Sequence, residues 1–556
     1  MSRSDRTAAY LLIALGAVIR AGAFLSGRSL WLDEAMLAVN ILDRSFSGLL
    51  RPLDLEQVAP PLFLFLERFA TQLAGPGEVT LRLVPFLASV ALLPVFWRLA
   101  RALLPAWWAV LALALAVFSP LLLEYSAELK QYALDGLMSA GLILLALRVI
   151  REPESAAPRR ALLATGVVAV WLSTPAVFVL AAAWAGVAFQ LVRLKARQHR
   201  GWLAAAPALW GAAFLVPYLL VYRAASSNPY LVKFWAGSFP DPFVPGFPAQ
   251  ASNAVSGIVE GSLFGPGLSL PAGVLIAALL IVLTGWARLW RVHGTAVGIL
   301  LAGLPVLFGV AALTRFYPPA PRLLLALVPV LILGFAAGLE GITSRIPAAR
   351  LRVAVAAALG LLSIVPAAAG ATRAWFADTE LAPFRPAVER LRAEIRPDDV
   401  VYLYARVLPV WAYYTVDWSR PERTRLHSIL SVAYRLGPNS GNRPSRGAAV
   451  DREGDDYVLE GPFGTELFGI PTGIEYPAPP NGRATPDPGW AENEVRRIRE
   501  RCATRVWLLF SHGSDAAEAA ILPLIEGNGF VEESRSRVRA VRLYRFSCPG
   551  PASSTS

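Results

Sequence analysis

The run LLLALVPVLILGFAAGL at residues 323–339 contains seventeen successive residues without a charged or hydrogen-bonding side chain. About twenty apolar residues cross the hydrocarbon core of a bilayer as an α-helix, so this run predicts a membrane span. Ten further runs are largely apolar, some with isolated polar or charged residues, and also predict spans. The eleven predicted spans are residues 8–25, 79–97, 106–123, 132–150, 161–171, 176–191, 202–222, 268–286, 296–313, 323–339 and 353–370.

The overall composition agrees with a chain built largely of such spans. Of its 556 residues, 55% are apolar and 17% charged, and the mean hydropathy is +0.49. Soluble chains carry about 25% charged residues. This balance disfavours a soluble enzyme, a disordered regulator and a collagen-like chain. We predict an α-helical polytopic membrane protein with about eleven transmembrane helices.

The basic residues are distributed unevenly along the chain. Residues 1–370 hold 28 Lys and Arg against 16 Asp and Glu, which accounts for the whole net charge of +12, whereas residues 371–556 hold 24 of each. Arginines concentrate in alternate loops, as expected of loops that face the cytoplasm. They place the N-terminus on the cytoplasmic side of the cytoplasmic (inner) membrane and residues 371–556 on its outer side. Plentiful Ala and Arg with scarce Lys suggest a bacterial source. These loops explain a pI near 10 without a nucleic-acid partner.

Two domains are expected, a transmembrane module over residues 1–370 and a soluble extracytoplasmic α/β domain over residues 371–556. In the second, strands at 399–404, 505–510 and 538–546 alternate with helices at 409–414, 492–501 and 516–526, an order typical of a small α/β fold. Residues 436–490 are rich in Pro, Gly, Asn and Arg and predict a long loop or partly disordered insertion. Cys502 and Cys548 both fall in this domain. Whether they pair in an oxidising compartment or remain free thiols is open.

Motifs of several other function classes are missing from the sequence. There is no G-x-x-x-x-G-K-[ST] loop, which disfavours an ATP-driven pump. There is no Cys-x-x-Cys, and the four histidines are too scattered for a metal motif.

The loop after the first span carries an adjacent acidic pair at the predicted membrane–water boundary. It reads SLWLDEA at residues 29–35, so Asp33 and Glu34 closely follow Trp31. Charged groups at this depth are costly and usually functional. In one interpretation Asp33 caps a helix over residues 34–42, with Glu34 in its first turn. In the other, which is compatible with the first, the carboxylate accepts a proton from an attacking hydroxyl group.

Two later loops on the same predicted side are dense in polar groups. Residues 123–135 read LEYSAELKQYALD, in which Glu128 and Tyr132 are one helical turn apart and Lys130 is one of three lysines in the chain. Residues 314–322 read TRFYPPAPR. Lysine and arginine are common partners of phosphate, so both loops predict phosphate binding. The alternatives are a solvated turn with local ion pairs in the first loop, and interfacial anchoring by arginine and tyrosine in the second.

Taken together, these motifs resemble the GT-C glycosyltransferases. More narrowly, they resemble the family 39 and aminoarabinose-transferase-like group, which uses polyprenyl-phosphate sugars. Proteins of this group share an acidic pair in the first outer loop, a Pro-Pro-Leu-aromatic segment, here residues 60–63, and a Tyr-Ser-x-Glu-x-Arg-Pro-Tyr-like second loop. This chain departs at Ala59, where histidine is common, at Lys130, where arginine is usual, and at Gln131, where proline is usual.

The resemblance covers residues 1–370 and is strongest over residues 28–135. It implies an inverting hexosyl- or pentosyltransferase of cell-envelope glycan synthesis. Such an enzyme moves a sugar from a polyprenyl-phosphate carrier to a hydroxyl or phosphate of a lipid, glycan or protein acceptor, in contact with membrane lipids. No cofactor is required, although carboxylates of two facing loops leave a shared divalent metal ion as an open alternative. The implied site comprises Asp33 and Glu34 as catalytic groups, Tyr125, Glu128 and Tyr132 as positioning groups for substrate or acceptor, and Lys130, Arg315, Tyr317 and Arg322 as ligands of the lipid phosphate.

Three other functions compete with this one. A lipid-linked glycan polymerase or ligase would share the topology, but an acidic pair so early in the chain is less expected there. A flippase needs charged residues deep in several spans, and Arg20 alone is a candidate. A membrane-anchored sensor gives no purpose to the polar loops.

Overall fold

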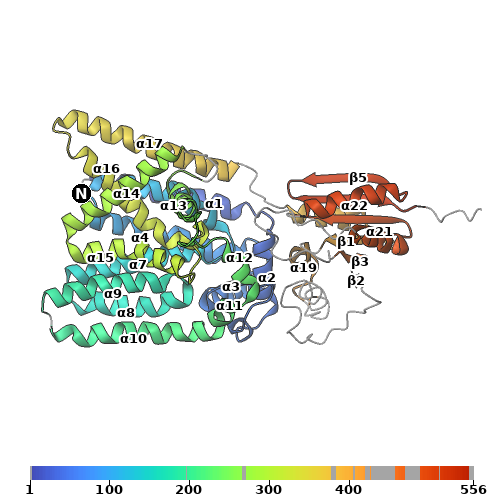
Figure 1. Ribbon diagram of the computed structural model, residues 1–556, viewed down its shortest axis with the longest axis horizontal. Helices are drawn as coiled ribbons and strands as arrows, with labels where there is room; N and C mark the ends of the chain where they lie inside the picture. Colours follow the sequence, from blue (N-terminus) through green and yellow to red (C-terminus); the bar gives the residue numbers. More distant parts are fainter. Residues whose placement is uncertain are drawn as a thin grey trace, which may run out of the picture. The chain divides into compact units, whose positions relative to one another are not determined.

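The computed structural model describes residues 3–195, 197–265, 271–376, 383–404, 407–419, 426, 458–461, 463–469, 489–511 and 514–549. Contacts divide the chain into two compact units, whose elements are labelled in Figure 1. The helical unit comprises Met1–Gly27, Val58–Ala224 and Trp235–Thr379. The sheet unit comprises Arg28–Gln57, Ala225–Phe234 and Glu380–Ser556. The loop that carries the acidic pair is therefore grouped with the C-terminal region.

The helical unit is built from long apolar helices. Each of the eleven apolar runs overlaps a helix, and within the described ranges nine helices, or ten with one bent pair, are long and apolar enough to cross a membrane. The run over residues 161–171 lies in α8, which has 17 residues and rises about 26 Å, at the short end of the lengths that cross a hydrocarbon core of about 30 Å. The helical elements are α1 (Arg3–Leu25), α3 (Pro61–Ala74), η2 (Thr80–Arg82), α4 (Leu83–Leu103), α5 (Ala106–Phe118), α6 (Pro120–Glu124), η3 (Tyr125–Ala127), α7 (Tyr132–Arg151), α8 (Ala156–Leu172), α9 (Ala176–Arg193), η4 (Arg197–His199), α10 (Arg200–Pro217), η5 (Tyr218–Tyr222), α13 (Phe247–Leu263), α14 (Ala272–His293), α15 (Thr295–Leu313), η6 (Pro321–Leu327), α16 (Val328–Thr343) and α17 (Ala349–Phe376), with α11 (Arg223–Ser226) and α12 (Pro229–Ala236) holding residues of both units.

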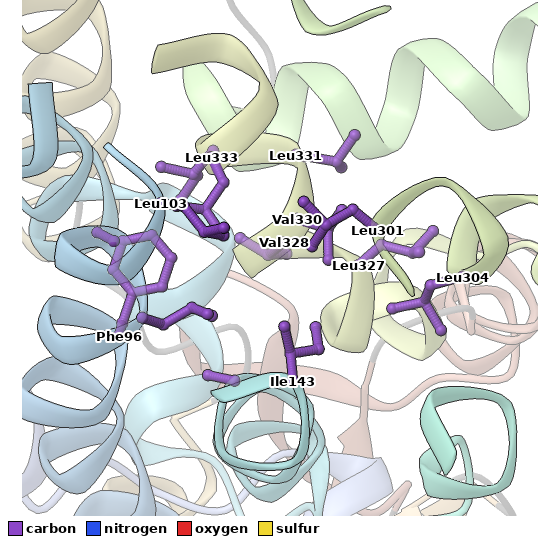
Figure 2. Packing of buried hydrophobic residues seen from close by; sticks show 14 of the residues in the cluster. Phe96, Leu103, Ile143, Leu301, Leu304, Leu327, Val328, Val330, Leu331 and Leu333 are labelled. Carbon is purple, nitrogen blue, oxygen red and sulfur yellow. The ribbon is translucent and has the colours of Figure 1, made fainter. Parts of the chain in front are cut away.

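The core of the helical unit is centred on α16. Its residues are buried from Val328 through Leu339, on every side of the helix, which is why the run 323–339 is apolar without a polar face. Figure 2 shows side chains of η6 and α16 meeting Phe96 of α4 and Ile143 of α7.

Glycine lets α14 and α16 approach one another closely. A Cβ atom on Gly285 would collide with the backbone carbonyl of Gly334, and one on Gly338 with the carbonyl of Ile281. Small residues permit such approaches between membrane helices, where packing contacts drive association in place of the hydrophobic effect.

The third predicted span is broken. Helices α5 and α6 meet at Ser119 and Pro120 with a bend of 48°, because proline has no N–H to donate and restricts the residue before it. In an unbroken helix, the residue at position 120 would donate its backbone N–H to the carbonyl of Ala116. Proline has no such N–H, so this carbonyl is left to another donor. Instead the guanidinium of Arg20 donates to the carbonyls of Ala116 and Val117, each at 3.3 Å. Arg20, the charged residue that the flippase alternative cited, thus fills a structural gap in the third predicted span.

The described residues of the sheet unit form a six-stranded sheet in the order β2-β3-β1-β4-β6-β5. Strand β1 is parallel to β3 and β4, with Val400 opposite Thr465 and Val506, and the other pairs are antiparallel. Every residue of β1 and β4 is buried, as expected of strands covered on both faces. The predicted α/β fold is confirmed. Its elements are α2 (Leu32–Asp43), η1 (Gly48–Leu50), α18 (Phe384–Glu394), β1 (Val400–Tyr404), α19 (Leu408–Thr415), β2 (Val458–Gly461), β3 (Gly464–Gly469), α21 (Trp490–Arg501), β4 (Arg505–Phe510), α22 (Asp515–Gly527), β5 (Val531–Val538) and β6 (Val541–Ser547).

Two details of this unit differ from the sequence predictions. Strands β2 and β3 occupy part of residues 436–490, so the loop expected there is wrong for residues 458–461 and 464–469, and most of the remainder lies outside the described residues. The final strand expected over residues 538–546 is the second arm of a hairpin, β5–β6, that turns at Arg539. The charged β5, largely exposed, lacks the apolar alternation that would have revealed it.

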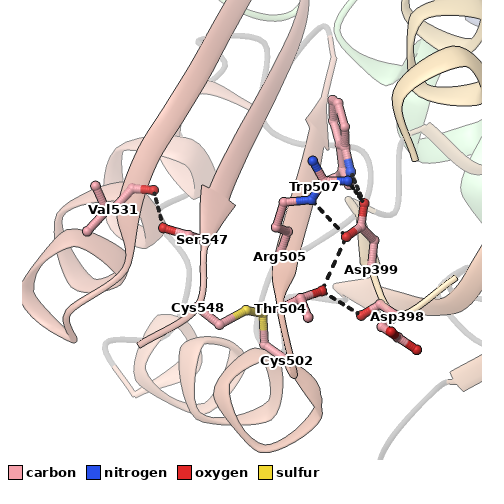
Figure 3. The surroundings of a disulfide bond; sticks show 9 residues. All are labelled: Asp398, Asp399, Cys502, Thr504, Arg505, Trp507, Val531, Ser547 and Cys548. Atoms are coloured by element: carbon pink, nitrogen blue, oxygen red, sulfur yellow. Dashed lines mark hydrogen bonds and ion pairs between the residues drawn. A yellow bond between two sulfur atoms is a disulfide. The ribbon is translucent and has the colours of Figure 1, made fainter. Parts of the chain in front are cut away.

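A disulfide and a buried ion pair fix one end of the sheet. Cys502 and Cys548 are bonded, with 5.9 Å between their Cα atoms, a normal separation. Beside them the carboxylate of Asp399 accepts hydrogen bonds from Arg505 (Nη2, 2.6 Å) and Trp507 (Nε1, 2.9 Å), as Figure 3 shows.

Candidate active site

The acidic pair lies at the start of α2 in the sheet unit, where its two members have different surroundings. Trp31 is the N-cap residue, so the alternative in which Asp33 caps the helix is wrong. Glu34 is fully buried, and its Oε2 accepts the Trp31 N–H at 3.4 Å, which satisfies a donor at the helix start. Asp33 remains partly exposed, and Nε2 of Gln57 donates to its Oδ1 at 3.5 Å. Glu34 thus stabilises the helix that presents Asp33.

The rest of this loop is closed by contacts around Asp54. Its N–H donates to Oδ1 of Asn40 at 2.7 Å, and Nδ2 of Asn40 donates to its carbonyl at 3.0 Å. Its carboxylate forms an ion pair of 2.7 Å with Arg44 at the end of α2. These bonds return the chain toward α2 and hold Gln57 near Asp33.

The second polar loop, in the helical unit, is buried and not solvated. Glu128 and Lys130 are each only 6% exposed, and the N–H of Lys130 donates to the carbonyl of Glu128 at 2.7 Å, which makes a tight turn. The rings of Tyr125 and Tyr132, on either side of this turn, pack edge to face with centroids 4.9 Å apart. Burial contradicts the alternative of a solvated turn.

The two arginines of the later loop contact different partners. Arg315 has a left-handed backbone (φ 57°), and its Nη2 lies 2.9 Å from Oδ2 of Asp241. The Arg315 side chain is 61% exposed, so this ion pair contributes about 0–1 kcal/mol and is easily exchanged. The guanidinium of Arg322 lies 5.3 Å from the centroid of the Trp235 ring, a cation–π distance.

Tyr317 projects from the same loop into an aromatic environment. Its ring packs edge-on against Phe308, with centroids 5.8 Å apart. Burial raises the pKa of the Tyr317 phenol well above its ordinary value near 10, and the nearby Asp135 carboxylate and Tyr132 raise it further. The phenol is therefore protonated at neutral pH and serves as a hydrogen-bond donor, here to the carbonyl of Leu323 at 3.2 Å.

Sequence reasoning did not place Asp135 in the site. This carboxyl group is buried in the first turn of α7, and its Oδ1 has no hydrogen-bond partner in the described part of the chain. Ser173 and Tyr222 interact with it, and the hydroxyl groups of Tyr222 and Thr174 are 3.2 Å apart. The sequence signal was an acid within the apolar run 132–150, a position that is usually functional.

Several predicted site residues come together in the helical unit. Tyr125 interacts electrostatically with Glu128 and Arg322, and Tyr317 does so with Tyr132. We call these five residues the tyrosine cluster.

The other predicted residues are placed differently. Lys130 is buried in the turn that follows Glu128, and Arg315 is engaged by Asp241. Asp33 and Glu34 belong to the sheet unit. In the described ranges, no group of three or more His, Cys, Asp or Glu is arranged to hold a metal ion.

Comparison with known proteins identifies the fold. Residues 58–171 match the profile of the family described as dolichyl-phosphate-mannose-protein mannosyltransferase. ArnT from Cupriavidus metallidurans, bound to undecaprenyl phosphate, is 15% identical, with 96% of this chain and 97% of that chain covered and a TM-score of 0.51. The Archaeoglobus fulgidus oligosaccharyltransferase in the apo form is 11% identical, with coverages of 96% and 74% and a TM-score of 0.49. No curated protein sequence matches this chain.

At this identity, the ArnT structure shows a shared fold across nearly the whole chain. The resemblance to the GT-C glycosyltransferases, predicted from the loop motifs, is confirmed at this level, and so is the multi-span membrane architecture with a C-terminal sheet region.

Proposed function

We propose that this chain is an inverting glycosyltransferase. In this proposal it moves a sugar from a polyprenyl-phosphate carrier to an acceptor hydroxyl or phosphate at the outer face of a bacterial cytoplasmic membrane. The observation that carries the proposal is the tyrosine cluster with Lys130, a set of polar and charged groups in an apolar helical body. Such groups in membrane proteins usually line a substrate path. The family profile over residues 58–171 and the fold of ArnT, a protein seen with undecaprenyl phosphate, support a lipid-phosphate donor.

The donor phosphate is assigned to the cationic side chains. Lys130, Arg315 and Arg322 bind it in this proposal, and the Tyr317 phenol donates a further hydrogen bond. Arg315 exchanges its carboxylate partner Asp241 for the phosphate, which costs little because the pair is exposed. Charge that develops on the leaving phosphate is then stabilised by positioned cations.

The chemical step is a single displacement at the anomeric carbon. The acceptor oxygen forms the new bond to C1 as the bond from C1 to the phosphate oxygen breaks, and the configuration inverts. Polyprenyl phosphate leaves with the bonding electron pair. The acceptor proton passes to the carboxylate of Asp33 as general base. Glu128, Tyr125 and Tyr132 position the substrate or acceptor.

Asp33 is favoured over Glu34 as the base because Asp33 is partly exposed, whereas Glu34 is fully buried. Glu34 then contributes to catalysis by holding the start of α2. An activated sugar phosphate as donor needs no nucleotide site. The disulfide between Cys502 and Cys548 supports an oxidising compartment for the sheet unit, in agreement with the proposed N-inside orientation.

The proposal is tested with purified protein in lipid and a panel of polyprenyl-phosphate sugars, with acceptor-containing membrane extract present. Release of polyprenyl phosphate is followed for the wild type, Asp33→Asn and Asp43→Asn. Asp43 ends the same helix, so its variant repeats the chemical change away from the proposed base. We expect Asp33→Asn to lower turnover by about 10²–10⁴-fold, and Asp43→Asn to leave it near the wild-type value.

Two results would contradict the proposal at different points. Turnover of no donor by the wild type would refute the donor class. Equal turnover by the wild type and Asp33→Asn would refute Asp33 as the base and leave the donor assignment intact.

A further inference from the structure

We infer that Tyr414 is a positioning residue of the transfer reaction, which holds the start of α2 and thereby the carboxylate of Asp33. The inference rests on the proposed function and extends it, because it makes the C-terminal sheet unit a working part of the catalytic machinery. All of the residues that carry it belong to the sheet unit.

Helices α2 and α19 pack against one another, although they are far apart in the sequence (Figure 1). In α2, Leu37 and Ile41 are buried, and in α19 Leu408 and Trp411 are fully buried. Both packed helices thus contribute buried apolar side chains to the sheet unit, and such burial stabilises the unit.

Two hydrogen bonds hold the backbone just before α2. The N–H of Leu30 donates to the phenol oxygen of Tyr414 at 2.9 Å, and the N–H of Arg385 donates to Oγ of Ser29 at 3.3 Å. Leu30 is fully buried, and a buried N–H without a partner is costly.

Tyr414 is itself held in place. The Nη2 of Arg392 in α18 donates to its backbone carbonyl at 2.6 Å, and its ring packs edge-on against Tyr413 with centroids 4.8 Å apart. A fixed phenol at the end of α19 is thus the acceptor for the segment that leads into α2.

The position of Asp33 follows from this anchor. Leu30 precedes the N-cap residue Trp31, and Asp33 is the second residue of the helix. Because a helix start moves as one unit, a shift of the Leu30 backbone displaces the Asp33 carboxylate by a similar amount. A general base acts within about 3 Å of the proton that it removes, and a misplacement of about 1 Å costs on the order of 10²-fold in rate.

The test compares Tyr414→Phe with Tyr402→Phe in the full-length protein. Tyr402 is buried in β1 and donates its O–H to Glu494 at 2.8 Å, so its variant also loses a phenol hydrogen bond in the sheet unit, away from the segment that leads into α2. We expect Tyr414→Phe to lower kcat about ten- to hundredfold with the KM for the donor unchanged. Tyr402→Phe is expected to keep kcat within about twofold of the wild type.

A double-mutant cycle separates positioning from a loss of stability. In the Asp33→Asn background, Tyr414→Phe is expected to cause no further loss of kcat, because it acts through Asp33. A further tenfold loss there would overturn the inference, and so would wild-type turnover by folded Tyr414→Phe.

Hydrogen exchange tests the anchor without any turnover. The peptide over residues 29–36 should exchange faster in Tyr414→Phe than in the wild type or Tyr402→Phe, whereas unchanged exchange would show that Tyr414 holds nothing. If the wild type uses no donor, the proposed function fails, and hydrogen exchange still decides whether Tyr414 anchors α2.

Discussion

Replacing Asp399 by alanine is expected to lower the stability of the sheet unit more than any exposed substitution. The carboxylate is almost fully buried and accepts bonds from Arg505 (Nε, 2.9 Å), Trp507 (Nε1, 2.9 Å) and the N–H of Arg396 (3.0 Å). Its removal leaves the guanidinium of Arg505, itself only 7% exposed, without its counter-ion. Breaking a buried ion pair in this way costs about 3–5 kcal/mol, a large part of the 5–15 kcal/mol typical of a domain.

The measurement is thermal unfolding of the full-length protein in detergent, followed by tryptophan fluorescence. For a unit of this size, a loss of 3–5 kcal/mol corresponds to a Tm lower by about 6–20 °C. Asp515→Ala is the matched control, because Asp515 is 79% exposed and its partner Arg542 is also paired with Glu518. An exposed pair contributes about 0–1 kcal/mol.

The pH dependence supplies a second measurement. Burial alone would raise the pKa of Asp399, but the hydrogen bonds from Arg505 and Trp507 outweigh it and hold the pKa below its ordinary value. The ion pair therefore contributes fully above the unfolded-state pKa near 4, and its contribution disappears as the pH falls through the lower folded-state pKa. The wild type should lose its advantage over Asp399→Ala in that acidic range.

The double variant Asp399→Leu with Arg505→Met distinguishes a lost ion pair from a damaged core. Apolar residues of similar volume commonly replace a buried pair without loss, so the part of the Tm loss that comes from the unpaired guanidinium should return. The part that comes from the donors of Trp507 and Arg396 should remain, because leucine accepts no hydrogen bond. A Tm for Asp399→Ala equal to that of Asp515→Ala would refute this reasoning.

Three other predictions concern single features of the structure. Burial raises the pKa of Glu67 in α3 well above its ordinary value, and neither carboxyl oxygen has a hydrogen-bond partner in the described ranges. Glu67→Leu should therefore stabilise the protein by about 1–3 kcal/mol and remove a decline in Tm as the pH rises above about 4.5. A lower Tm for this variant would show that Glu67 has a partner. Asp241→Asn should free Arg315 and tighten donor binding up to about fivefold, the equivalent of an exposed pair, with the gain absent in the Arg315→Ala background; a gain that persists there would remove Arg315 from the phosphate site. Changing Cys502 and Cys548 together to serine should lower the free energy of unfolding by about 4 kcal/mol, because the disulfide closes a loop with a sequence separation of 46 residues. The Tm of this variant should be lower than that of the wild type, and reductant should not lower it further. A Tm equal to the wild-type value would contradict this.

The helical fold was predictable because a bilayer leaves the backbone few choices. A segment in hydrocarbon must satisfy its own hydrogen bonds, so an apolar run such as 323–339 can hardly be anything but a helix. What the runs could not show was how helices meet. The approach of Gly285 to Gly334 depends on residues far apart in the sequence. The break at Pro120 was visible as a proline, but the filling of its gap by Arg20 was not.

The sheet was predictable only where a strand carries its own apolar signal. Strand β4, RVWLLF at 505–510, is apolar in itself and coincides with the prediction. Strand β3, GTELFG at 464–469, has two large apolar residues between terminal glycines, and glycine weakens a strand signal. It is a strand because it pairs with β2 in a tight hairpin on one side and with β1 on the other, and β1 lies far earlier in the chain, outside any local window.

The candidate site shows the same limit at the scale of single residues. Loop composition predicted that Tyr132 and Tyr317 belong to a site, but their proximity, and that of Asp135, comes from the packing of α7 against η6. Arg315 looked like a ready phosphate ligand, whereas in the structure it is paired with Asp241. Sequence patterns name the chemical groups, and tertiary contacts decide which of them are engaged.

The acidic pair shows why adjacent, similar residues need not share a role. Successive residues of an α-helix point about 100° apart, so side chains that are equivalent in the sequence face different surroundings at the start of α2. Glu34 turns inward and accepts the backbone N–H of Trp31, while Asp33 stays partly exposed beside Gln57. Starting the helix one residue earlier would bring Asp33 to the place that Glu34 holds now. The contacts that fix the start, including the bond from Leu30 to Tyr414, therefore help to decide which carboxylate is fully buried and which stays partly exposed.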